Sequence, residues 1–287
     1  MQRIRVDYDL KPGQSLFVAP FNDIHYNTEE CDRDRFHRYI EWGVKQIKAG
    51  NQILGIGLGD YNDMFSPSER ASVVSAKGGY GLHETTLKEL DKLYEKQITA
   101  FAKAIMPWRN YVRMLLEGHH YACYSGYHSY KPMRSKSTTE HLVKLLGPNC
   151  KYGGQLGIVD ANFGHGLRLR IVATHGYGGA RTPGSRVIKR VRMNEVYEGD
   201  LYLMAHDNTK MAISDNVLSH TAGGKFVSRK RTYCGVGSFQ KAYPDNNPSG
   251  GYVEAIMLPP SDLGAVITEV RVENRKGKWR LDWHTSV

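Results

Sequence analysis

Five apolar, β-rich runs along the chain each stop abruptly at acidic or histidine residues. Short apolar runs of this kind predict buried strands. In an α/β sheet, ligands gather in the crevice outside the carboxyl ends of the strands, so we expect the polar residues to meet there. The runs cover residues 15–20, 52–58, 111–116, 167–173 and 201–204, and the polar residues that follow them are Asp23, His25, Asp60, His119, His120, His175 and His206.

Helices are predicted between several of these strands. In the stretch before Gly50, apolar residues such as Phe36, Ile40 and Ile47 recur at helical spacing. Alternation of strands and helices favours the α/β fold class with a largely buried sheet. Helices are expected over 34–48, 85–105, 138–146 and 185–196.

The pattern changes after Asn208 to short β runs. We expect these runs to complete a second sheet and to give a four-layer αββα sandwich. No Pro/Ser-rich linker separates them from the rest, so residues 1–287 are predicted to form a single domain. The runs cover 225–227, 232–235, 251–257 and 265–272.

Composition is that of a globular protein, with 40% hydrophobic and 24% charged residues. The longest apolar run near the amino terminus, 16–21, is too short to span a bilayer, which predicts a chain without a membrane partner. Four widely spaced cysteines without a C-x-x-C pair suit a reducing compartment, so we expect a cytoplasmic protein. The net charge of +10 favours anionic partners such as phosphate esters or nucleic acid.

The ordered set of acidic and histidine residues resembles the pattern of the calcineurin-like metallophosphoesterases. That family carries D-x-H, G-D-x-x-D, G-N-H-[DE], a lone His and G-H-x-H in this order. The matching stretches here are D-I-H (23–25), G-D-Y-N-D (59–63), G-H-H-Y (118–121), His175 and A-H-D-N (205–208), and the later Gly237-Ser238-Phe239 is similar to the family's closing turn.

The resemblance implies a site for two divalent metal ions. Two such ions would neutralise the charge of a phosphate ester and generate a hydroxide nucleophile from water. Mn²⁺ is the expected metal, with Zn²⁺, Fe or Mg²⁺ as alternatives. By resemblance, Asp60 bridges both ions, Asp23 and His25 bind the first, His119, His175 and His206 bind the second, His120 protonates the leaving oxygen, and Asp63 orients a neighbouring loop through hydrogen bonds.

Two departures from the family pattern change the expected metal preferences. His119 stands where the family has Asn, and Asn208 stands where the family has its last His. An imidazole-rich second site suits borderline ions such as zinc, whereas a first site with the amide oxygen of Asn208 suits manganese or magnesium. We therefore expect two sites of unequal affinity.

Residues that would bind substrate are expected around the metals. Tyr121, Tyr177 and Arg181 are the candidates, and the insertions at 64–84 and 121–137 are expected to form the walls of the site. Tyrosines recur every third residue from 121 to 130 and could stack on bases, or could belong to a packed loop. Two basic clusters could bind backbone phosphates, or could be solvated faces: Arg181, Arg186, Lys189, Arg190 and Arg192, and Lys225, Arg229, Lys230 and Arg231.

The sequence thus predicts a metal-dependent phosphoesterase, with a phosphodiesterase or nuclease favoured over a phosphomonoesterase. A phosphoprotein phosphatase is not expected. Such enzymes of this superfamily continue G-D-x-x-D with Arg-Gly and carry G-N-H-E, whereas this chain continues with Met64-Phe65 and carries G-H-H-Y. The alternative from another class is a non-catalytic nucleic-acid-binding or assembly protein with a vestigial metal site. The sequence indicates no oligomeric state.

Overall fold

Two β-sheets form the centre of the fold in the computed structural model, which describes residues 1–64, 83–124, 137–220, 223–243, 254, 257 and 259–287. One sheet has the order β1-β6-β7-β8-β10-β11 with β9 paired to β10, and the other has the order β13-β12-β2-β3-β4-β5. The first comprises β1 (Gln2–Asp7), β6 (Leu156–Asn162), β7 (Arg168–Thr174), β8 (Leu201–Met204), β9 (Lys210–His220), β10 (Phe226–Ser238) and β11 (Gly264–Ala265). The second comprises β2 (Leu16–Phe21), β3 (Gln52–Gly57), β4 (Val112–Leu116), β5 (Lys151–Gly154), β12 (Ile267–Arg275) and β13 (Lys278–Ser286).

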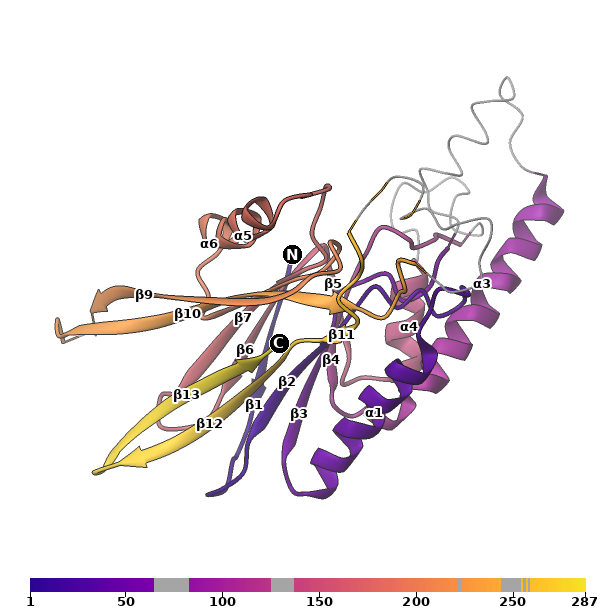
Figure 1. The fold of residues 1–287 in the computed structure, drawn as a ribbon. Helices are drawn as coiled ribbons and strands as arrows, with labels where there is room; N and C mark the ends of the chain where they lie inside the picture. The colour runs from indigo at the N-terminus through magenta and orange to yellow at the C-terminus, as the bar shows by residue number, and fades with distance from the viewer. Residues whose placement is uncertain (65–82, 125–136, 221–222, 244–253, 255–256, 258) are drawn as a thin grey trace.

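Helices cover the outer face of each sheet (Figure 1). The helices α1 (Arg33–Lys48), α3 (Glu84–Ile105) and α4 (Thr138–Leu146) pack on the sheet that contains β2 to β5, while α5 (Pro183–Val191) and α6 (Met193–Val196) pack on the other. Three apolar clusters fill the spaces between these four layers. The predicted αββα sandwich is therefore confirmed.

Alternation along the strands distributes side chains between the layers. In β2, Leu16 and Val18 face the cluster between the sheets, whereas Ala19 and Phe21 belong to the cluster under the helices. Both faces are apolar because both are covered, as expected of buried parallel strands. The polar residues are thereby left to the strand ends.

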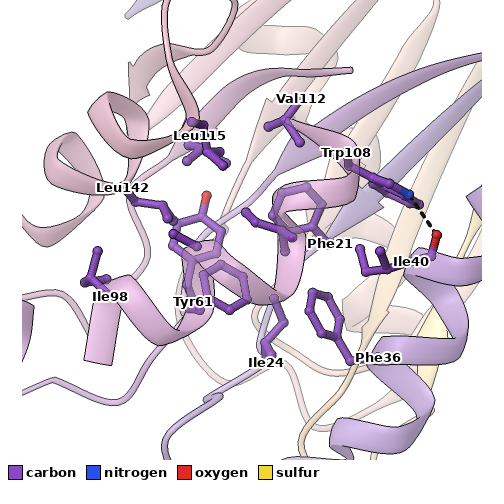
Figure 2. Close-up of a cluster of buried hydrophobic side chains, with 14 of the residues drawn as sticks. Phe21, Ile24, Phe36, Ile40, Tyr61, Ile98, Trp108, Val112, Leu115 and Leu142 are labelled. Carbon is purple, nitrogen blue, oxygen red and sulfur yellow. Dashed lines mark hydrogen bonds between the residues drawn. The ribbon is translucent and has the colours of Figure 1, made fainter. Parts of the chain in front are cut away.

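The cluster under α1, α3 and α4 supports the loops that carry the site (Figure 2). Ile24, in the loop after β2, and Tyr61, in the loop after β3, are buried in it. The Tyr61 hydroxyl donates to the carbonyl of Leu116 at the end of β4 (2.9 Å). The Trp108 indole donates to the carbonyl of Ile40 (2.9 Å), which joins α1 to the cluster. Apolar packing thus holds the loops after three strands in fixed positions.

The helix predicted over 185–196 is broken into two. Arg192 is the single residue between the end of α5 and the start of α6. The other predicted helices begin and end within about one residue of the expected positions, a normal difference for helix ends. The start of α4 has a capping box, in which Ser137 and Glu140 bind each other's backbone N–H.

The C-terminal strands differ from the expectation. They do not complete one second sheet: β9 and β10 join β8, whereas β12 and β13 join β2. The runs at 225–227 and 232–235 are parts of the single long strand β10. The predicted run at 251–257 lies mostly outside the described residues, and Glu254 and Met257 within it are not in a strand.

The strands β1 and β6 were not predicted, although they pair with each other along their whole length. Within the described parts of the chain, we find no helix whose length and apolar character would let it cross a membrane.

Candidate metal centre

The loops that follow β2, β3 and β4 are joined through their backbones. The Asp23 N–H donates to the carbonyl of Gly59 (3.2 Å), and the His25 N–H donates to the carbonyl of Asp60 (3.1 Å). A Cβ on Gly118 would lie 2.0 Å from Oδ1 of Asp60, and one on Gly59 would lie 2.5 Å from Cα of Gly118. Glycine at these two positions therefore lets the β3 and β4 loops touch.

Five residues predicted to hold the metals have a left-handed backbone. Their φ angles are 44° at Asp23, 46° at His25, 52° at Asp60, 74° at His206 and 53° at Asn208. Non-glycine residues avoid this region because Cβ crowds the following carbonyl. Such conformations cluster where a protein has to aim functional side chains, so the five strained positions single out this strand-end crevice as the candidate site.

Asp60 lies at the centre of the crevice and is buried. Its Oδ1 accepts the backbone N–H groups of His119 (2.6 Å) and His120 (2.9 Å), and its Oδ2 lies 3.1 Å from Nε2 of His175. Burial opposes ionisation, but the neighbouring His175, His25 and His120 outweigh it and hold the pKa of Asp60 well below its usual range. The carboxylate is therefore ionised and aimed between the histidines of two loops.

Three imidazoles meet on one side of Asp60. The ring centroid of His119 lies 4.8 Å from that of His175 and 4.5 Å from that of His206. The ring nitrogen Nδ1 of His175 is 2.8 Å from the carbonyl of Leu58, which directs Nε2 of this ring toward Asp60. A backbone carbonyl on the far nitrogen is the usual way in which a metal-binding histidine is oriented.

The three imidazoles have pKa values shifted in opposite directions, upward for His175 and downward for His119 and His206. Burial works against protonation of His175, but Asp60 and Asp23 outweigh it and raise its pKa to about 9. Burial, reinforced by His175, lowers the pKa of His206 to about 4. Burial and the same neighbour also lower the pKa of His119. His119 and His206 are therefore neutral at physiological pH, the form in which imidazole binds a metal.

Asp23 is held from both sheets. The side-chain amide of Asn22 donates to its Oδ2 (2.5 Å), and the backbone N–H of His206 donates to the same oxygen (3.1 Å). The hydroxyl of Ser238 and the N–H of Phe239 donate to its carbonyl (3.1 and 3.0 Å). Sequence reasoning missed Asn22, whose only signal is its place directly before Asp23.

His120 and Asp63 form a pair at the mouth of the site. Oδ1 of Asp63 is 2.7 Å from Nδ1 of His120, and its Oδ2 is 3.8 Å from Nδ1 of His25. Burial raises the pKa of Asp63, but the hydrogen bond to His120 and the nearby His25 ring outweigh it and leave the pKa well below its usual range. The backbone of Asp63 also pairs with the side chain of Asn27 (2.6 and 2.8 Å). Asp63 thus contacts the expected catalytic histidine itself, beyond the loop-orienting role we expected.

The donor set fits divalent cations. Among the described residues, Oδ1 of Asn208 is buried and lacks a hydrogen-bond partner. Nε2 of His175 and Nδ1 of His25 are also buried, and each has only a carboxylate beside it, Asp60 at 3.1 Å and Asp63 at 3.8 Å, without hydrogen-bond geometry. Buried polar atoms without partners are costly and need an explanation, which a cation would supply. Ligand atoms within 4.8 Å of one another form three overlapping groups: His119, His175 and His206; His25, Asp60 and His120; and Asp23, Asp60 and His175.

The expected substrate-binding residues lie in different surroundings. The Tyr177 side chain is 65% exposed, and the Lys189 ammonium lies 5.3 Å from its ring centroid. Arg181 is exposed and Tyr121 is half-buried. Tyr124 is buried, and its hydroxyl lies 2.7 Å from Nδ1 of His141, so it belongs to a packed region and offers no base-stacking face. Residues 65–82 and 125–136, with the two remaining tyrosines of the series, lie outside the described residues.

The basic residues of α5 are not a solvated face. Lys189 and Arg190 are buried, and their polar atoms contact the loops of the site. We expected this cluster either to bind backbone phosphates or to be a solvated face. Arg190 does neither, because its side chain is buried against the protein and pairs with Asp207. In the second basic cluster Arg229 pairs with Glu198 and Asp200, and Arg231 pairs with Asp215.

Comparisons with known proteins identify no family for this chain. No protein-family model matches the chain, and no curated protein sequence matches it. Among solved structures, Vacuolar Protein Sorting 29 from Cryptosporidium parvum aligns at 12% identity with a TM-score of 0.33, covering 95% of this chain and 98% of that one. A single mutant of Vps29 from Entamoeba histolytica aligns at 9% identity with a TM-score of 0.35, covering 94% and 99%. Alignments of this quality identify neither a family nor a function.

Proposed function

We propose that the chain is a metal-dependent phosphoesterase with two divalent cations, and that its substrate is a phosphodiester. The observation that carries this proposal is the convergence of carboxylates and imidazoles from both sheets, beside the amide oxygen of Asn208, which is buried and has no hydrogen-bond partner among the described residues. Carboxylates beside imidazoles suit Mn²⁺ and Zn²⁺. Such ions would neutralise the phosphate charge and make water a better nucleophile at neutral pH.

The residues of the crevice can be assigned to two metal sites that share one carboxylate. Asp60 would bridge the ions, because its carboxylate lies between the His25 and His175 sides of the crevice. His119, His175 and His206 would hold one ion, while Asp23 and His25 would hold the other. Asn208 would add its amide oxygen, which is buried without a partner among the described residues.

His120 would deliver the proton to the leaving oxygen. Its Nδ1 is taken by Asp63 at 2.7 Å, so Nε2 is the nitrogen that can carry the transferred proton. The Asp63 carboxylate stabilises the protonated ring and keeps it oriented, as a carboxylate does for a general-acid histidine. The pair is partly exposed, with both side chains at 42%, so a substrate can reach it.

The test is hydrolysis of generic aryl phosphates by the metal-loaded protein. We expect Mn²⁺-dependent hydrolysis of bis(p-nitrophenyl) phosphate, faster than that of p-nitrophenyl phosphate, and loss of nearly all activity in Asp60→Asn. Asp9→Asn is the matched control, because Asp9 is an exposed aspartate outside the site. Faster hydrolysis of the monoester would overturn the substrate class. Two bound metals without hydrolysis of either ester would leave a non-catalytic protein.

A further inference from the structure

Helix α5 lies against the loops that follow β7 and β8. Its Arg186 donates from Nε to the carbonyl of Ala180 (2.9 Å) and from Nη1 to the hydroxyl of Thr209 (2.7 Å). Its Lys189 donates to the carbonyl of Gly178 (3.3 Å). One helix thus contacts the segment after His175 and the segment after His206 with side chains of a single face.

The deepest of these contacts is an ion pair beneath the His206 loop. The side chain of Arg190 is 1% exposed, and that of its partner Asp207 is 5% exposed. Nη2 of Arg190 binds Oδ1 of Asp207, while Nη1 donates to the carbonyl of Arg186 in the preceding turn (2.8 Å). A Cβ on Gly235 would lie 2.5 Å from the guanidinium, so this glycine of β10 leaves the room that Arg190 occupies.

The position of Asp207 gives this pair a consequence for the site. Asp207 stands between His206 and Asn208, whose φ angles of 74° and 53° are both left-handed. Asp207 belongs to none of the candidate metal-binding groups among the described residues, and its Oδ1 binds Arg190. An arginine that holds Asp207 therefore constrains a loop whose neighbours on both sides are in a disfavoured conformation.

We propose that Arg190 is a positioning residue for the metal held by the three imidazoles, acting through Asp207 on His206. The inference rests on the proposed function, because it presumes that His206 binds a metal. Arg190 is not one of the candidate metal ligands, and α5 contacts both the segment after His175 and the segment after His206. Removal of a residue that orients a ligand typically lowers metal affinity by about 10- to 100-fold.

The experiment is a Mn²⁺ titration by calorimetry. We expect two sites in the wild-type protein, and in Arg190→Met a loss of about 10- to 100-fold in the affinity of one site, with the other site within about twofold. Asp207→Asn should give a smaller loss at the same site. Arg192→Met is the matched control, since Arg192 is an exposed arginine two residues further along the chain, and both of its affinities should be unchanged.

A double-mutant cycle separates positioning from general loss of stability. If Arg190 acts through His206, Arg190→Met should add no further loss of Mn²⁺ affinity to His206→Ala, but should retain its full effect in His25→Ala. Equal weakening of both sites, or an additive effect with His206→Ala, would overturn the inference. If Arg190→Met does not fold, Arg190→Lys replaces it in the same cycle. Lysine keeps the positive charge but lacks the two guanidinium nitrogens that bind Asp207 and the carbonyl of Arg186. A wild-type protein that binds no divalent metal would refute the proposed function, whereas normal binding by the variant refutes only this inference.

Discussion

At the residue scale, the site depends on hydrogen bonds that aim each ligand or catalytic group. His175 is turned by the carbonyl of Leu58, Asp23 by Asn22, and His120 by Asp63. In each case a hydrogen bond from the protein fixes one polar atom of the side chain. The chemistry therefore resides in a few atoms whose orientation can be tested one at a time.

Replacement of His120 tests the proton transfer. We expect His120→Ala to lower turnover of an unactivated alkyl phosphodiester by about 100-fold or more, because the leaving alkoxide would depart without a proton. The loss should shrink for a p-nitrophenyl ester, whose leaving group needs no proton. Steady-state kinetics on both substrates measure this difference. Loss of a metal equivalent in the same variant, seen by elemental analysis, would instead make His120 a ligand.

The pKa shifts predict how the metal-free protein responds to pH. The ordinary pKa of histidine is 6.5, and that of His206 is lowered to about 4, so between these values the unfolded chain binds more protons and stability rises with pH. The pKa of His175 is raised to about 9, so above 6.5 the folded chain binds more protons and stability falls as pH rises. Thermal unfolding in EDTA should therefore show a maximum near pH 6.5, and His206→Gln should flatten the acid side. A steady rise of Tm from about pH 5 to pH 8 would contradict these shifts.

At the element scale, the strand-end loops are close enough that single atoms decide whether they fit. Asp60 packs directly on Gly118, and the β3 loop meets the β4 loop at Gly59. The sequence shows these residues only as parts of short motifs. The structure shows that they set the spacing of two elements.

A methyl group on Gly118 should displace the central carboxylate. Gly118→Ala would place Cβ 2.0 Å from Oδ1 of Asp60, so the loop has to move. A displacement of about 1 Å can cost about 100-fold in rate, and we expect a loss of that order in hydrolysis together with weaker Mn²⁺ binding. Gly184→Ala is the control, because a Cβ there meets no atom within 4 Å. Wild-type kinetics in Gly118→Ala would show that the contact is easily relieved.

The elements of the site were predictable because each strand changes from apolar to polar residues where it ends. This pattern placed Asp23, Asp60 and His175 at strand ends, and the apolar spacing located α1 and α3. The partners of α5 were not predictable, because a basic helix face has the same sequence whether it meets water or an acidic loop. Asp207 likewise carries no signal of its own, since only the folded chain brings Arg190 to it. The ligand roles of the site residues stay predictions.

At the scale of the whole molecule, the candidate site joins the two sheets. The ends of β2, β3 and β4 supply Asp23, Asp60 and His119, whereas the ends of β7 and β8 supply His175 and His206. A cation bound by both sets would therefore cross-link the halves of the sandwich. Its binding should appear in the global stability as well as in activity.

Metal should stabilise the fold by mass action. At 100 times its dissociation constant a ligand that binds only the folded state contributes about 2.7 kcal/mol, which corresponds to a rise in Tm of roughly 5 °C or more. We expect this rise when Mn²⁺ replaces EDTA, and most of it should vanish in Asp60→Asn. Asp9→Asn should keep it. Calorimetric scans of the three proteins with and without Mn²⁺ measure the effect, and an equal rise in Asp60→Asn would place the ion elsewhere.

The division of the imidazoles between the sheets also bears on how the chain reaches its final state. His119 follows a strand of one sheet and His175 and His206 follow strands of the other, and the N–H of His206 meets Asp23 across 183 residues of sequence. The chain entropy lost in closing such a long loop must be offset before the three rings can meet. A nascent chain in which only β2 to β5 have assembled lacks two of the three rings. Capture of a cation by all three rings is therefore a late event, available only to chains whose halves have docked, and it favours the finished protein over partly folded competitors.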